Sequence, residues 1–308
     1  MNNANPTRDI FIGIDGGATK TIVRVENVHG EILGQGQGGP ANIRLSVQDS
    51  WRSVNDALIE ALASSGLRPD DGEHRFYCGA RLAGTEVASA CDQFLNTPHP
   101  FAQLMLKSDG YTSCLGAHGG QDGAMIAIGT GTVGFQIEAR KEYKVGGWGF
   151  PHGDEGSGAW LGLEAVRLTL HWLDGRGEPS PLLEAVHAHF DHDLDRLVVW
   201  ANQANATQFA RIAPLVIEHV KLQTPLALTL IQQAAREIDR LAVALAAQSV
   251  DKGLPCSLLG GLAPFIEPWL GETLRTRLVP CKLDAVHGAV LMIRKAVQDQ
   301  LLTEIDRK

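Results

Sequence analysis

The chain contains one strand–turn–strand pattern twice, and this repeat constrains its fold more than any other feature. Residues 11–25 (FIGIDGGATKTIVRV) and 124–138 (AMIAIGTGTVGFQIE) each place a glycine-rich turn between two apolar runs. A simple hairpin needs only two turn residues, whereas these turns combine glycine amides with hydroxyl groups, and the first adds a carboxylate. Such groups can hold phosphate oxygens and Mg²⁺, although either turn alone is equally well explained as an ordinary tight turn. Two copies about 110 residues apart predict a duplicated domain whose turns grip one nucleotide polyphosphate.

The composition limits the classes of protein to which this chain can belong. The 308 residues are 44% hydrophobic and 20% charged, as expected for a globular chain with one large or two medium domains. A net charge of −8 argues against a nucleic-acid or membrane partner. The N-terminus lacks a signal core, no apolar run reaches the length of a membrane span, and the five cysteines show no C-x-x-C spacing. We therefore expect a reduced, cytoplasmic protein.

Three motifs carry a resemblance to a known family: DGGAT at 15–19, GTGT at 129–132 and GGWGFPHGDEGSG at 146–158. The chain resembles the N-acetylglucosamine and glucosamine kinases of the BadF/BadG/BcrA/BcrD ATPase family, in the actin-like ATPase superfamily. The resemblance implies an α/β fold of two duplicated RNase H-like (actin-like ATPase) domains with a cleft between them. It assigns residues 1–118 and a closing helix 288–308 to the first domain, and 119–287 to the second, with a hinge at Gly119-Gly120.

The activity implied by the resemblance is transfer of the γ-phosphate of ATP to the 6-hydroxyl of N-acetylglucosamine or glucosamine. Mg²⁺ would accompany ATP and be held near Asp15. Domain closure would exclude water and limit wasteful ATP hydrolysis. The implied ATP-binding residues are Gly16, Gly17, Thr19, Thr130, Gly131, Thr132, Gly260, Gly261 and Leu262.

Asp109 is the candidate catalytic base. It follows a predicted strand at 103–107, and ligands bind at the carboxyl ends of strands in open α/β sheets. From the residues alone, a helix-capping role is the better explanation. The resemblance instead implies that Asp109 accepts the proton of the sugar 6-hydroxyl as that oxygen attacks the γ-phosphate.

The resemblance also implies the sugar-binding residues, which are Asn42, Gly84, Asp109, Trp148, Gly149 and Asp154. Asn42 could equally be a turn asparagine. The acidic pair Asp154-Glu155 could favour the dipole of the helix that follows, and Asp154 could also help to order Mg²⁺.

Three positions depart from the family pattern. Ala18 replaces the third glycine of DGGGT, which costs about 1 kcal/mol if that residue needs a positive φ; otherwise the turn differs slightly. Val133 stands where many acetylated-sugar kinases have asparagine, which puts an acetamido contact in doubt. Arg81 replaces a small or apolar residue, and the sequence assigns it no role.

Three histidines, at 187, 189 and 192, invite a metal interpretation. Offsets of two and five residues do not share one face of a helix, so we expect surface or interface residues instead.

Elsewhere, glycine and proline predict a loop, and hydrophobic periodicity predicts helices and a strand. The loop is expected at 35–45, helices at 209–220, 264–274 and 285–302, and a strand at 282–284.

Two other functions remain open. An activator ATPase of the BadF type would need paired cysteine ligands for an iron–sulfur cluster, and no such pair is evident. A non-catalytic sugar sensor usually carries a fused DNA-binding domain, and the ten residues before the first strand leave no room for one at the N-terminus. Relatives often form dimers, so ATP, an amino sugar and a second copy of the chain are the expected partners.

Overall fold

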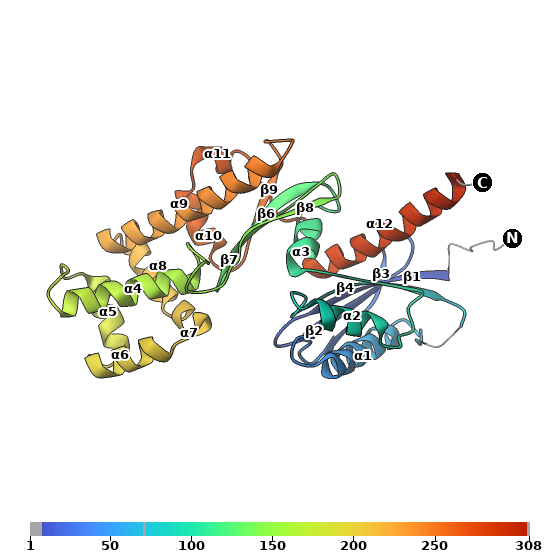
Figure 1. The fold of residues 1–308 in the computed structure, drawn as a ribbon, viewed down its shortest axis with the longest axis horizontal. Helices are drawn as coiled ribbons and strands as arrows, with labels where there is room; N and C mark the ends of the chain where they lie inside the picture. The colour runs from blue at the N-terminus through green and yellow to red at the C-terminus, as the bar shows by residue number, and fades with distance from the viewer. Residues whose placement is uncertain (1–7, 70–71, 307–308) are drawn as a thin grey trace. The chain divides into compact units, whose positions relative to one another are not determined.

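The computed structural model describes residues 8–69 and 72–306, which form two compact units (Figure 1). Unit 1 contains the residues up to Asp122 and those from Cys281 onward, and unit 2 contains Gly123–Pro280. In each unit an antiparallel hairpin lies beside a parallel strand, in the orders β3-β2-β1-β4-β5 and β8-β7-β6-β9. This shared order confirms the predicted α/β fold of two duplicated domains. No helix in the described residues is long and apolar enough to cross a membrane.

Unit 1 is a sheet covered by helices on both faces. Its elements are β1 Asp9–Gly16, β2 Thr21–Glu26, β3 Ile32–Gly38, α1 Val47–Ala63, β4 Arg75–Leu82, α2 Ala88–Asn96, β5 Gln103–Lys107, α3 Asp109–Ala117 and α12 Ala285–Asp306.

Alternate residues of β1 serve the two faces of this sheet, as the two-residue period of a strand requires. Ile12 and Ile14 are fully buried in the core that contains α1. Phe11 lies on the opposite face, where it packs with Val290 and Ile293 of α12. Figure 1 shows α1 (blue) and α12 (red) on either side of the sheet.

Residues 32–38 form strand β3, so the first four residues of the loop predicted at 35–45 are strand instead. The glycines of this strand recur at every second position and point at α1. A Cβ added at Gly34, Gly36 or Gly38 would lie 2.0–2.1 Å from a carbonyl oxygen of that helix. Glycine is therefore present because the helix packs directly on the strand backbone.

We predict that Gly36→Ala destabilises the protein by about 1–3 kcal/mol, because the new methyl group overlaps the carbonyl of Ala57. Gln37→Ala is the matched control, since that neighbouring side chain is exposed. Urea unfolding followed by circular dichroism measures both. Equal stability of the two variants would contradict the close packing.

Unit 2 is a smaller sheet under a large group of helices. Its elements are β6 Gly123–Ile128, β7 Thr132–Glu138, β8 Lys141–Gly146, α4 Gly158–Leu173, α5 Pro181–His189, α6 Leu194–Gln203, α7 Ala206–Ala210, α8 Ala213–Lys221, α9 Pro225–Gln248, β9 Cys256–Leu259, α10 Ala263–Ile266, the 3₁₀ helix η2 Glu267–Trp269 and α11 Glu272–Arg275.

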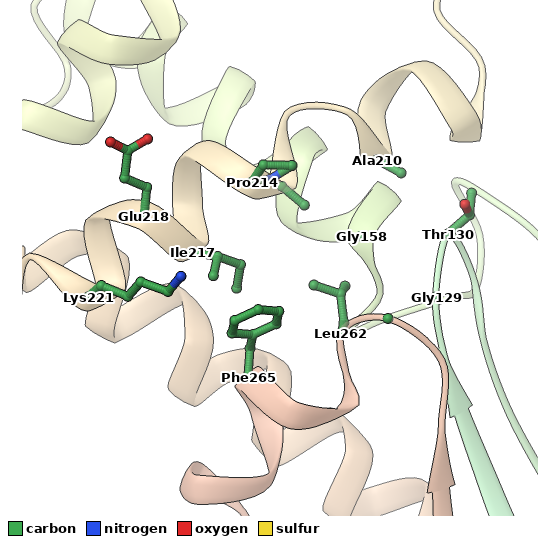
Figure 2. Close-up of a pocket in the computed structure, with 12 residues that line it drawn as sticks. Gly129, Thr130, Gly158, Ala210, Pro214, Ile217, Glu218, Lys221, Leu262 and Phe265 are labelled. Atoms are coloured by element: carbon green, nitrogen blue, oxygen red, sulfur yellow. The ribbon is translucent and has the colours of Figure 1, made fainter.

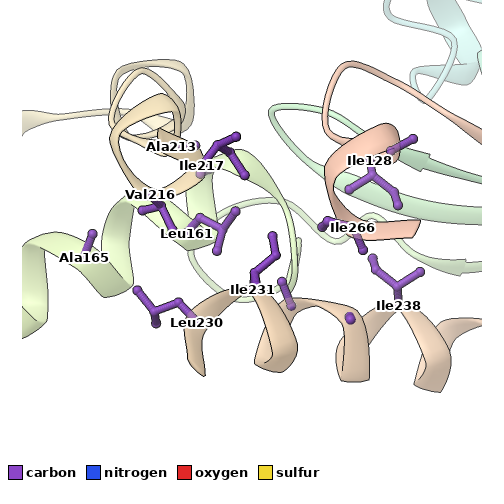
Figure 3. Close-up of a cluster of buried hydrophobic side chains, with 14 of the residues drawn as sticks. Ile128, Leu161, Ala165, Ala213, Val216, Ile217, Leu230, Ile231, Ile238 and Ile266 are labelled. Atoms are coloured by element: carbon purple, nitrogen blue, oxygen red, sulfur yellow. The ribbon is translucent and has the colours of Figure 1, made fainter. Parts of the chain in front are cut away.

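The core of unit 2 joins the sheet to these helices. Ile128 at the end of β6, Leu161 of α4 and Ile238 of α9 are all fully buried in one cluster (Figure 3). This cluster fixes the end of β6, and hence the turn that follows it.

Two predicted elements are wrong in their boundaries. The helix predicted over 209–220 is interrupted between α7 and α8, because Pro214 lies at the start of α8. The helix predicted over 264–274 is divided at Gly271 into short pieces.

The strand predicted at 282–284 is absent. Instead, the backbone N–H groups of Lys282 and Leu283 donate to carbonyls at the end of α3 (3.0 and 3.2 Å). The edge of β9 is covered by a single bridge between Cys256 and Leu278.

Candidate active site

The first glycine turn joins β1 to β2 and has exposed residues at its tip. The N–H of Gly17 donates to the carbonyl of Lys20 (2.9 Å), and Ala18 and Thr19 are exposed. Ala18 is not among the described residues with a positive φ, so it carries none of the strain that a glycine would have relieved. A Cβ on Gly16 would lie 2.4 Å from Cδ2 of Leu82, so that glycine is required by packing beneath the turn.

Three charged side chains meet where β1, β4 and β5 end. Asp15 on β1 is paired in register with Arg81 on β4. Nε of Arg81 lies 2.6 Å from Oδ1 of Asp15, and its guanidinium also donates to the carboxylate of Asp109. Arg81 therefore bridges the predicted metal ligand and the predicted base, and sequence reasoning gave it no role. A cation among acidic residues at the ends of three parallel strands is the signal that could have found it.

Asp15 is held in an unfavourable environment for a charge. Burial raises the pKa of Asp15, the attraction of Arg81 opposes this shift, and the negative charge of Asp284 adds to it. Carboxylate oxygens are the ligands that Mg²⁺ prefers. A Mg²⁺ ion bound beside Asp15 would relieve its repulsion with Asp284.

Asp109 is free of the capping role that its position suggested. Ser108 is the N-cap of α3, and its hydroxyl accepts from the N–H of Tyr111 (3.3 Å). The carboxylate of Asp109 instead accepts from the hydroxyl of Ser113 (3.0 Å), and its side chain is 69% exposed. An exposed, oriented carboxylate can accept a proton from an incoming hydroxyl.

Asn42 and Gly84 lie together, as two of the predicted sugar-binding residues should. Gly84 has a φ of +92°, and a Cβ there would lie 2.7 Å from Oδ1 of Asn42. The same Oδ1 accepts from the N–H of Arg44 (3.2 Å), so Asn42 does form the local turn that was its alternative interpretation.

The second glycine turn, in unit 2, is hydrogen-bonded to the start of α4. The N–H of Gly129 donates to the carbonyl of Gly131 (2.9 Å), and the carbonyls of Gly129 and Thr130 accept from the first residues of α4. Asp154 lies against this turn: its Oδ1 accepts from the N–H of Thr132 (3.1 Å), and a Cβ on Gly131 would lie 2.9 Å from the carboxylate. In this unit Asp154 is thus a neighbour of the predicted phosphate turn.

A pocket of about 700 Å³ begins at the same turn (Figure 2). Thr130 and Gly158 line one end, Leu262 and Phe265 lie in the middle, and Lys221 lies at the other end. Gly260 has a φ of +95° and a Cβ there would lie 2.4 Å from the carbonyl oxygen of Ile128, which sets the Gly-Gly-Leu turn directly against the end of β6.

The pocket also contains residues that the sequence reasoning missed. Pro214 and Ile217 of α8 supply apolar surface, and Nζ of Lys221 lies 5.3 Å from the centre of the Phe265 ring. A proline inside the predicted helix over 209–220 was the signal for a turn here.

Trp148 and Gly149 belong to an irregular loop, as predicted. The side chain of Trp148 is 84% exposed and Gly149 has a φ of +90°.

Comparison with known proteins identifies the family. The model of the BadF/BadG/BcrA/BcrD ATPase family matches residues 12–291. The chain belongs to this family. Glucosamine kinase GspK of Vibrio cholerae is 37% identical to this family member over 92% of the chain and 96% of the relative. N-acetylmuramic acid/N-acetylglucosamine kinase of Clostridium acetobutylicum is 24% identical over 92% of this chain and 97% of the relative.

A crystal structure from Chromobacterium violaceum supports the same family. That protein, whose provisional name is N-acetylglucosamine kinase, matches with a TM-score of 0.80 and 37% identity, over 94% of this chain and 99% of the other.

We predict that Asp15→Asn raises the melting temperature at neutral pH. The raised pKa means that the folded state binds its proton more tightly than the unfolded state does, so the ionised form destabilises the fold above that pKa. The advantage of the variant should shrink as the pH falls through the raised pKa, where wild-type Asp15 becomes neutral. Differential scanning calorimetry across the acid range measures this.

Asp284→Asn is the control of opposite sign. Partial burial alone would raise the pKa of Asp284, but hydrogen bonds from the His287 amide and from Arg24 bring it below its usual value. The variant should therefore lower the melting temperature at neutral pH, and this loss should fade as acid protonates the wild-type group. A fall for both variants would contradict the burial cost at Asp15.

Proposed function

We propose that the chain transfers the γ-phosphate of ATP to the 6-hydroxyl of an amino sugar, with glucosamine as the preferred acceptor. The observation that carries this proposal is the pocket of unit 2, which begins at a Gly-Thr-Gly turn and continues over apolar side chains and the ring of Phe265. This sequence of surfaces suits a polyphosphate followed by a nucleoside. Kinases for glucosamine and N-acetylated amino sugars among the relatives support the acceptor class.

The nucleotide would be held by residues of both glycine turns. Amides and hydroxyls at Thr19, Thr130 and Thr132 suit the phosphates, with Gly16, Gly17 and Gly131 allowing close approach of the backbone. Gly260, Gly261 and Leu262 would take the adenosine, on the wall that also contains Phe265.

Asp109 would act as the base toward the sugar hydroxyl. Its exposed carboxylate is already oriented by Ser113 and Arg81. Asp15 would hold Mg²⁺, which supplies charge neutralisation for the transferred phosphoryl group. Asn42, Gly84, Trp148, Gly149 and Asp154 are the proposed sugar contacts.

Arg81 is proposed as a positioning residue. Its planar guanidinium contacts Asp15 and Asp109 at once, which a lysine ammonium cannot do with the same geometry. The guanidinium would fix the direction of the Asp109 carboxylate.

Val133 favours glucosamine over the N-acetylated sugar. Its Cγ2 would be 2.9 Å from a Cβ on Gly147, so the side chain packs against the start of the loop that carries Trp148. A valine offers no hydrogen bond to an acetamido group, and an unmatched buried amide costs affinity.

The cysteines do not favour an iron–sulfur activator. Cys78, Cys114 and Cys256 are buried in the cores of the two units. Burial raises the pKa of Cys256 to about 11, so the thiolate that a cluster requires is disfavoured. A homodimer, implied by the family resemblance, and a cytoplasmic location, expected from the N-terminus and the cysteines, stay predictions.

An ADP-release assay with Mg-ATP tests the activity against glucosamine, N-acetylglucosamine, glucose and no sugar. We expect glucosamine to give kcat/KM at least about tenfold above the N-acetylated sugar, a difference of about 1.4 kcal/mol. A preference for the N-acetylated sugar would refute only the argument from Val133 and would leave the kinase activity standing. ADP release at a rate that does not depend on the sugar would refute the kinase proposal and favour the activator ATPase.

In the same assay, Asp109→Asn should lower kcat by about 10²–10⁴-fold, the usual contribution of a general base. Asp49→Asn, an exposed carboxylate of α1, is the control. Full sugar-dependent turnover by Asp109→Asn would remove Asp109 from the mechanism.

Arg81→Met should lower kcat about 10–100-fold and leave the KM of the sugar nearly unchanged. It should also move the acid limb of the pH–rate profile to higher pH, because a positive charge beside the base is lost. Arg81→Lys should restore part of kcat and most of the pH profile.

Arg75→Met is the matched control, since Arg75 lies on the same strand and pairs with Asp9 (2.7 Å) away from this cluster. An unchanged pH profile in Arg81→Met, or an equal defect in Arg75→Met, would show that Arg81 is only structural.

A further inference from the structure

We propose that Glu184, His187 and His192 form a binding site for a divalent transition-metal ion, with Zn²⁺ as the preferred occupant. Within the described residues, a carboxylate oxygen and one nitrogen from each ring lie within 4.8 Å of one another. These groups belong to α5 and to the turn after it, and they are distinct from every residue that we assign to phosphoryl transfer.

The way in which α5 ends brings together two histidines that the sequence spacing predicted to lie apart. The helix stops at His189, and Asp191 and His192 then take positive φ values of 58° and 55°. The N–H of His192 consequently donates back to the carbonyl of His187 (3.1 Å). The turn therefore brings His192 back toward His187, whereas an uninterrupted helix would have kept them apart.

Glu184 and His187 share one face of α5 because they are three residues apart. A Glu-x-x-His pair on a helix is a recurrent way to present two metal ligands. Nδ1 of His192 lies 3.7 Å from Oε1 of Glu184, and the rings of the two histidines are 5.1 Å apart at their centres. The three side chains therefore converge from two backbone segments.

His187 has a ring nitrogen that the described protein atoms leave unsatisfied. Its Nε2 is buried and has no hydrogen-bond partner in the described residues. A buried polar atom without a partner is costly and calls for an ion or a water. The ring is further enclosed by Trp172, whose centre is 6.1 Å away.

The dimensions suit a first-row metal after small side-chain movements. Three atoms within 4.8 Å of one another have a common centre no more than about 2.8 Å from each, and Zn–N and Zn–O bonds are about 2.0–2.2 Å. Rotations that move each ligand atom by less than about 1 Å close the site. Two imidazoles and one carboxylate favour Zn²⁺ over Mg²⁺, which prefers an all-oxygen shell.

Such an ion would join the last turn of α5 to the segment that leads into α6. Metal that binds the folded state and not the unfolded chain raises the melting temperature, and the rise grows with the logarithm of the free metal concentration above the Kd. The expected role is therefore a staple at the α5–α6 corner, separate from catalysis.

Calorimetric titration of the tag-free, full-length protein with Zn²⁺, in excess Mg²⁺ to occupy oxygen-rich sites, tests the proposal. We expect one Zn²⁺ per chain with a Kd of about 10 µM or tighter. His192→Asn and Glu184→Gln should each weaken binding at least about tenfold, because each removes a ligand. His189→Asn is the matched control on the same helix, since its ring packs on Phe190 and lies outside the group.

Thermal unfolding of the same proteins provides the second measurement. Zn²⁺ should raise the melting temperature of the wild type and of His189→Asn, and not that of His192→Asn, while the metal-free proteins melt alike. Absent binding, a millimolar Kd typical of adventitious ions, unchanged affinity in His192→Asn, or an equal loss in His189→Asn would each overturn the site. None of these outcomes depends on kinase activity.

Discussion

The ion pairs of Arg81 are the interaction on which the arrangement of acidic side chains at the strand ends of unit 1 depends. The parallel register of β1, β4 and β5 places Asp15, Arg81 and Lys107 side by side at one edge of the sheet. Arg81 contacts the carboxylates of both Asp15 and Asp109, whose like charges would otherwise repel each other. One guanidinium between them offsets this repulsion and orients both acidic groups at the strand ends where we propose that Mg²⁺ and phosphate bind.

Close packing keeps this edge in place. A Cβ on Gly13 or Gly79 would lie 2.5 or 2.0 Å from a carbonyl of α12, as the glycines of β3 do with α1. Helices on both faces thus touch the strand backbone with no side chain between them. Because such contacts do not compress, the ends of the strands cannot drift relative to the helices that cover them.

The sequence predicted those features that depend on local pattern and failed where tertiary contacts decide. The repeated turns and Asp109 at a strand end were recognised because periodicity and position are local. Strand β3 was missed beyond residue 34, because glycine propensity was read without the helix that makes glycine necessary. The pairing of His187 with His192 was missed because it depends on two consecutive positive φ values, at Asp191 and His192, which no periodicity in the sequence indicates.

The place of α12 has a consequence for the order in which the chain acquires its structure during synthesis. Phe11 is covered by Val290 and Ile293, and Arg24 pairs with Asp284, so unit 1 joins residues about 260 positions apart. Unit 2 is continuous and has its whole sequence outside the ribosome first. Domains usually mature from the N-terminus onward. Here the unit whose translation begins first is completed after unit 2, and one face of β1 stays uncovered until α12 has been translated.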